Sequence, residues 1–111
     1  MEYLNKGIEI HSGSANTIIT AGGSDKLLIK TIHLTNFTSS NAQITLQWTD
    51  SSDSNAPYYI AKDVVIPNGS SFQAIDGTLV LDNGDSLKGE TDISGSVQCT
   101  LSYIQITNDE G

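Results

Sequence analysis

The chain has 111 residues, enough for a single domain with a real core, and we expect residues 1–111 to fold as one unit. Thirteen acidic residues against five lysines, with no arginine, give a formal net charge of −8. This balance argues against nucleic acid and anionic membrane surfaces as partners, because both are bound through cations.

Short apolar or alternating segments, separated by turn-forming residues, make up the whole sequence and predict β-strands. We expect strands at residues 3–10, 17–20, 27–37, 42–50, 58–66, 71–75, 78–81, 86–91 and 96–107. No segment shows the 3.6-residue apolar period of a core helix. The pattern predicts an all-β fold, an antiparallel β-sandwich of jelly-roll type with about eight strands.

Alternation within the strands predicts which side chains face the core. Leu28-Ile29-Lys30 departs from strict alternation and indicates either a β-bulge or a buried edge. Turns are predicted at Pro67-Asn68-Gly69 and at 82–85, and the polar segment 51–56 is expected to be an exposed loop. The residues expected to pack between the sheets are Ile32, Leu34, Ile44, Leu46, Trp48, Val97, Cys99 and Leu101.

The residues that commonly carry catalysis are few and isolated, so we assign no catalytic residue and expect no enzymatic activity. His11 and His33 lie outside any metal-binding spacing, and Cys99 sits at an apolar position and is expected to be a small core residue. As the sole cysteine it excludes an intrachain disulfide. The first residues lack a signal-peptide pattern, so we expect synthesis in the cytoplasm.

Two groups of carboxylates have two interpretations each. Asp82 with Asp85, and Asp50 with Asp53 and Asn55, offer oxygen ligands of the kind that Ca²⁺ prefers. Aspartate and asparagine also form turns without an ion, by bonding to their own backbone. We therefore assign no metal site and no cofactor, and leave Ca²⁺ binding by the 50–55 loop open.

The aromatic residues give the remaining candidates for a binding surface. Trp48, Tyr58 and Tyr59 are of the type that stacks on sugar rings, although Trp48 shares its alternation face with core residues. Adjacent tyrosines in a strand point to opposite faces, so one of them is expected to be exposed. We predict an interaction surface that includes Tyr58, Tyr59 and His33.

The order of five segments resembles a group of small β-sandwich virion proteins encoded by tailed bacteriophages. The segments are the Ile8-Glu9-Ile10 strand leading to 16–21, then Ile29-Lys30-Thr31-Ile32-His33-Leu34-Thr35-Asn36, Tyr58-Tyr59-Ile60-Ala61-Lys62-Asp63-Val64 with 66–70, 79–87, and Leu101-Ser102-Tyr103-Ile104. These motifs are structural and transfer no catalytic residue.

The resemblance implies a non-enzymatic structural protein of the virion, a capsid decoration (cement) protein or a neck or tail attachment component. Its expected partners are other virion proteins and copies of itself, with a trimer as the first expectation. Two alternatives remain from other classes. One is a carbohydrate-binding module that recognises host surface glycans, and the other is a small cupin-like enzyme, which the missing metal-ligand set disfavours.

Overall fold

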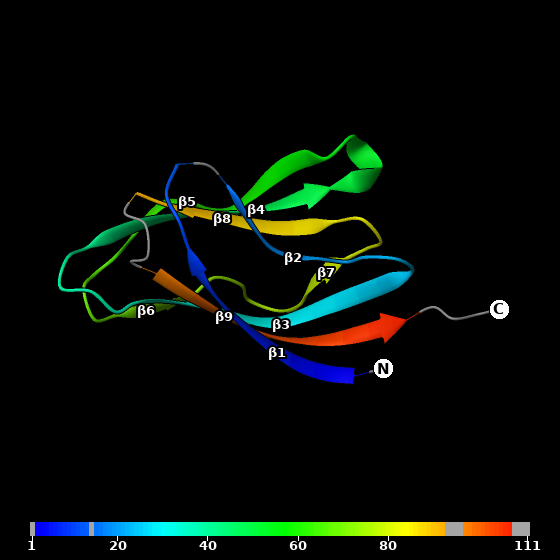
Figure 1. Cartoon of the computed structure of the whole chain (residues 1–111), viewed down its shortest axis with the longest axis horizontal. Helices are drawn as coiled ribbons and strands as arrows, with labels where there is room; N and C mark the ends of the chain where they lie inside the picture. The colour runs from blue at the N-terminus through cyan, green and yellow to red at the C-terminus, as the bar shows by residue number, and fades with distance from the viewer. Residues whose placement is uncertain (1, 14, 93–96, 108–111) are drawn as a thin grey trace.

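The computed structural model describes residues 2–13, 15–92 and 97–107 and places nine strands in two antiparallel sheets (Figure 1). One short 3₁₀ helix, η1 (Ser51–Asp53), is the only helical element in these ranges. The strands are β1 (Glu2–Ile10), β2 (Asn16–Thr20), β3 (Asp25–Asn36), β4 (Ala42–Asp50), β5 (Ala56–Ile66), β6 (Ser71–Gln73), β7 (Leu79–Leu81), β8 (Ser86–Thr91) and β9 (Val97–Thr107).

The two sheets confirm the predicted β-sandwich. The first sheet has the order β1-β9-β3-β6, and β7 pairs with β3 beside β6; the second has the order β2-β8-β4-β5. The chain crosses between the sheets at most connections, although β4 and β5 form a hairpin in the second sheet and β6 and β7 both lie in the first. The last two strands, β8 and β9, insert next to β2 and β1. This connectivity leaves β1 and β2 at neighbouring edges of the two sheets (Figure 1).

The core lies between the sheets, where the alternation predicted it. Seven of the eight predicted core residues are fully buried, from Ile32 and Leu34 in β3 to Leu101 in β9. Trp48 is the exception: it packs against the core but is only half-buried. It lies near the end of β4, and its indole nitrogen donates to the carboxylate of Asp85, so the polar edge of the ring stays at the rim of the core.

The strand registers contain several bulges. The pairing of β3 with β9 shifts between Ile29 and Thr31, which confirms the bulge alternative indicated near Lys30. The pairing of β4 with β5 shifts twice, on either side of Leu46. Asp63, in the bulged part of β5, has a positive φ of 53°. These shifts, which alternation alone does not reveal, determine which β5 side chains stand over the outer face of the sheet.

The predicted turns and loop are also found. Ser70 donates its backbone NH to Pro67 and Asp85 to Asp82, and Gly69 and Gly84 have positive φ. Strand ends differ by up to two residues; β6 ends at Gln73, although Ala74 still donates its NH to Ile32 of β3. The predicted start of the last strand, at residue 96, lies outside the described residues. No helix in the described ranges is long and apolar enough to span a membrane.

Candidate functional site

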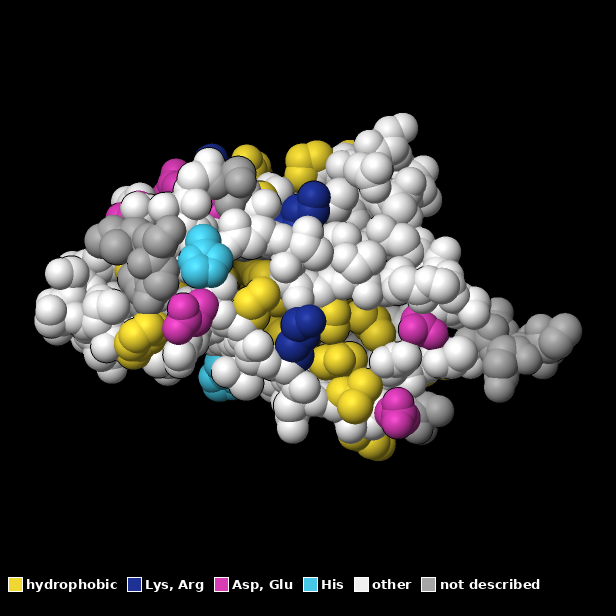
Figure 2. All heavy atoms as spheres, viewed as in Figure 1, with side chains coloured by type: hydrophobic (Ala, Val, Ile, Leu, Met, Phe, Trp, Pro, Cys, Tyr) yellow, Lys and Arg dark blue, Asp and Glu magenta, His cyan; other side chains and the backbone are white. Residues whose placement is uncertain are grey.

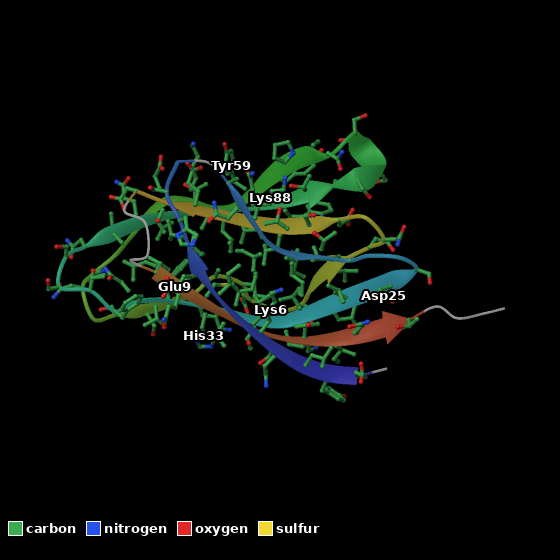
Figure 3. The ribbon with its side chains drawn as sticks, in the orientation of Figure 1. Lys6, Glu9, Asp25, His33, Tyr59 and Lys88 are labelled. Atoms are coloured by element: carbon green, nitrogen blue, oxygen red, sulfur yellow. The ribbon has the colours of Figure 1, made fainter. Side chains whose placement is uncertain are left out.

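The three residues predicted to share one interaction surface lie on three different faces. His33 is exposed on the outer face of the first sheet, and Tyr59 is exposed on the outer face of the second (Figure 3). Tyr58, the neighbour of Tyr59, turns to the inner side of β5, beside Trp48. The predicted surface is therefore not a single site, although each of these residues is exposed.

Tyr58 and Trp48 form an aromatic pair at the far end of the β4–β5 hairpin. Their ring centroids are 5.4 Å apart with an interplanar angle of 31°. The Tyr58 hydroxyl donates a hydrogen bond of 2.9 Å to Asp53, and this bond and the charge of Asp53 raise the pKa of Tyr58. The pair is thus held by the hairpin's own polar contacts, with 47% of Tyr58 exposed.

Asp85 is the polar centre of this end of the molecule. Its carboxylate accepts hydrogen bonds from the Ser51 backbone NH (2.9 Å), the Ser51 hydroxyl (3.0 Å), the Asp82 NH (3.0 Å) and the Trp48 indole (3.2 Å). Burial favours the neutral acid, but these bonds outweigh it and lower the pKa of Asp85. The carboxylate is thus a structural acceptor that joins the 82–85 turn to the end of β4.

Tyr59 lies in a groove of about 200 Å³ on the outer face of the second sheet. The register places Tyr59 directly opposite Gln47 on β4, and Gln47 opposite Lys88 on β8. The ammonium of Lys62 stands 4.7 Å from the centroid of the Tyr59 ring. The lining residues come from β4, β5 and the end of β8: Gln43, Thr45, Gln47, Tyr59, Lys62, Asp63, Glu90, Thr91 and Asp92.

Hydrogen bonds within the groove shape its floor. The Thr45 hydroxyl donates a hydrogen bond of 3.3 Å to the Asp63 carboxylate, and it accepts a hydrogen bond of 3.1 Å from the Asp63 backbone NH. Asp92 accepts the Gln43 backbone NH over 2.9 Å. Among the described residues, the side chains of Gln47 and Glu90 make no hydrogen bond, so both can form hydrogen bonds with a ligand.

The four sheet edges differ in how strongly they resist a further strand. The β6–β7 edge consists of two three-residue strands, β2 is five residues long with a register shift, and β5 carries Pro57 and two shifts. β1, by contrast, pairs with β9 in one unbroken register over nine residues, and six of them are exposed. Figure 2 shows hydrophobic side chains at the surface between the sheets on this side of the molecule.

The two carboxylate groups considered for Ca²⁺ are used by the chain itself. Asp50 caps η1 by accepting the Ser52 NH (3.0 Å) and hydroxyl (2.7 Å), and Asp53 accepts Tyr58. Within the described ranges, no three His, Cys, Asp or Glu side chains gather in a way that would hold a metal ion. The observed contacts are those of the turn-forming interpretation.

Cys99 is buried, as predicted, and burial raises its pKa to about 12. The thiol therefore stays protonated at neutral pH and has no nucleophilic character.

Sequence reasoning missed two features: the buried role of Asp85, and the gathering of Lys62 and Glu90 around Tyr59. The short Asp82–Asp85 spacing was a visible signal for a turn, but the contact with Trp48 spans 37 residues of sequence. The groove depends on the bulges in β5, for which the sequence carries no local signal.

A comparison with protein-family models gives no match, and a comparison with curated proteins gives none either. Two similar solved structures are described as pentameric capsid proteins isolated from metagenomic phage sequences. They are 17% and 15% identical to this chain, with TM-scores of 0.48 and 0.46. The alignments cover 98% of this chain but only 63% and 65% of those proteins. Similarity this distant does not identify the function of the chain.

Proposed function

We propose that the protein is a non-enzymatic structural component of a bacteriophage virion, a capsid decoration protein or a neck or tail attachment component. It acts through protein–protein contacts, with other virion proteins and with copies of itself. The order of its sequence segments, which resembles small phage β-sandwich proteins, supports this class of function.

The observation that carries the proposal is the open edge of β1. A long, regular edge strand presents a row of backbone NH and C=O groups that invite pairing, and natural proteins usually block such edges with prolines, bulges, short strands or charged side chains. The other three edges carry such features, whereas β1 has neither proline nor register shift. A protein that keeps one edge regular has a surface suited to assembly.

The composition of β1 fits contact with a folded partner better than uncontrolled aggregation. Charged residues are spread along it, with Glu2 and Glu9 near its ends and Lys6 between them. Lys6 and Glu9 are labelled in Figure 3. Leu4 and Ile8 are half-buried on the same side of the strand as Lys6. A partner strand would complete the backbone pairing and cover these apolar side chains, while the charges restrict which partners fit.

A charge placed on β1 tests whether this edge mediates assembly. Gly7 is exposed, and a Cβ at this position would meet only the Cys99 carbonyl oxygen at 4.0 Å, so Gly7→Lys fits the folded chain. We expect it to weaken self-association by roughly tenfold, about 1.4 kcal/mol, as measured by multi-angle light scattering across a concentration series.

Gly22→Lys is the matched control, because Gly22 is exposed in a loop with no atom within 4 Å of an added Cβ. Both variants change the net charge from −8 to −7, so a difference between them reports the position and not the charge. Equal association of the wild type and both variants would remove β1 from the assembly surface.

A further inference from the structure

We propose that the groove around Tyr59 is a binding site for an uncharged sugar, so that the protein also recognises glycan. This inference does not rest on the role in the virion: a protein that fails to assemble through β1 keeps the groove on the opposite sheet.

The groove combines an exposed aromatic ring with polar side chains that point into a hollow. Tyr59 is 57% exposed, and the CH groups of a sugar ring pack on the face of an aromatic ring of this kind. The groove, about 200 Å³ and open to solvent, suits a terminal sugar unit rather than a buried cofactor.

The hydrogen-bonding groups of the groove match the hydroxyl groups of a sugar, each of which both donates and accepts. The side-chain amide of Gln47 can donate and accept hydrogen bonds, the carboxylate of Glu90 can accept them, and the ammonium of Lys62 can donate them. Thr45 and Asp63 are bonded to each other and hold the β5 bulge in place beneath them. The polar lining is therefore partly preorganised and partly available to a ligand.

The charge of the lining favours a neutral ligand. Among the described residues that line the groove, Lys62 is the only cation, against the carboxylates of Asp63, Glu90 and Asp92. An anionic ligand would meet three like charges there. Lys62 stands over one side of the Tyr59 ring and, as an exposed long side chain, can swing aside to bond a hydroxyl of the bound sugar.

An NMR titration of the ¹⁵N-labelled protein tests the site. The probes are maltose, cellobiose, lactose and N,N′-diacetylchitobiose, each added up to about 50 mM, since an open groove of this kind binds in the millimolar range. We expect saturable shifts with at least one disaccharide at amides of β4 and β5 that line the groove. The absence of saturable shifts there with all four sugars would overturn the proposal.

Three variants distinguish stacking of the sugar on the Tyr59 ring from other contributions to binding. Tyr59→Ala should weaken binding at least tenfold, while Tyr59→Phe, which keeps the ring, should retain most of it. Tyr3→Ala is the matched control, because Tyr3 is a 77% exposed tyrosine on β1 in the other sheet, and it should bind as the wild type does. Unchanged amide dispersion verifies that each variant is folded. Binding that survives Tyr59→Ala, or that occurs only with an anionic polysaccharide such as heparin, would contradict the inference.

Discussion

At the scale of single residues, Asp85 shows how one buried carboxylate organises a whole end of the sandwich. Four donors converge on it from the β4 end, the 82–85 turn and the Trp48 ring. A buried charge is stable only where hydrogen bonds replace the water it has lost, and the lowered pKa of Asp85 reflects this arrangement.

Replacing Asp85 with asparagine should destabilise the protein by about 2–3 kcal/mol at neutral pH, because an NH₂ group then faces buried donors. Asp82→Asn is the control: this side chain is exposed, and its change should cost less than about 0.5 kcal/mol. Urea denaturation of the three proteins measures the difference. Equal stability of Asp85→Asn and the wild type would show that the carboxylate is not the structural centre described.

The same residue predicts a pH dependence. Since the folded pKa of Asp85 lies below its ordinary value of 3.8, its contribution is present above about pH 4 and is lost as the pH falls through the folded pKa. The stability gap between the wild type and Asp85→Asn should therefore narrow below pH 4. A gap that stays constant from pH 7 to pH 3 would contradict the assignment.

At the scale of elements, the turn between β7 and β8 depends on Gly84. Its φ is +89°, and an added Cβ would lie 2.8 Å from the hydroxyl oxygen of Ser51, which itself bonds to Asp85. Gly69 also has a positive φ, +73°, but nothing lies within 4 Å of the corresponding Cβ. A comparison of substitutions at the two glycines therefore distinguishes the cost of the backbone conformation from the cost of a steric clash with Ser51.

We expect Gly69→Ala to cost about 1–2 kcal/mol from the backbone conformation alone, and Gly84→Ala to cost more, because Ser51 must also move. Thermal and urea unfolding of both variants provide the comparison. A smaller loss for Gly84→Ala than for Gly69→Ala would show that the contact with Ser51 is not tight.

The sequence and the structure agree best where structure is local. Ile44 and Leu46 alternate with polar residues, and the turns that begin at Pro67 and Asp82 consist of residues that favour turn conformations. The positions of the strands could be predicted from these features. The sequence could not show that the register slips around Leu46, since a bulge depends on both paired strands. The predicted surface of Tyr58, Tyr59 and His33 is separated in the folded chain for other reasons. Tyr58 and Tyr59 point to opposite faces of β5, and His33 lies on a strand of the other sheet, a placement that only the topology determines.

At the scale of the whole molecule, the net charge of −8 opposes the proposed assembly. Like-charged subunits repel over a distance set by the salt concentration, about 30 Å at 0.01 M and about 8 Å at 0.15 M. Association should therefore strengthen as salt rises from about 0.01 M to about 0.15 M. Light scattering at both concentrations tests this, and association that weakens with salt would point to contacts based on opposite charges instead. The expected trimer would be read from the same masses.

The most direct test of the proposed function is sedimentation of the protein with purified particles of a phage whose genome carries its gene. We predict that the wild type and Gly22→Lys pellet with the particles at a saturating, reproducible copy number, and that Gly7→Lys pellets much less. Failure of the wild type to bind the particles at micromolar concentration, at both low and physiological salt, would contradict a structural role in the virion.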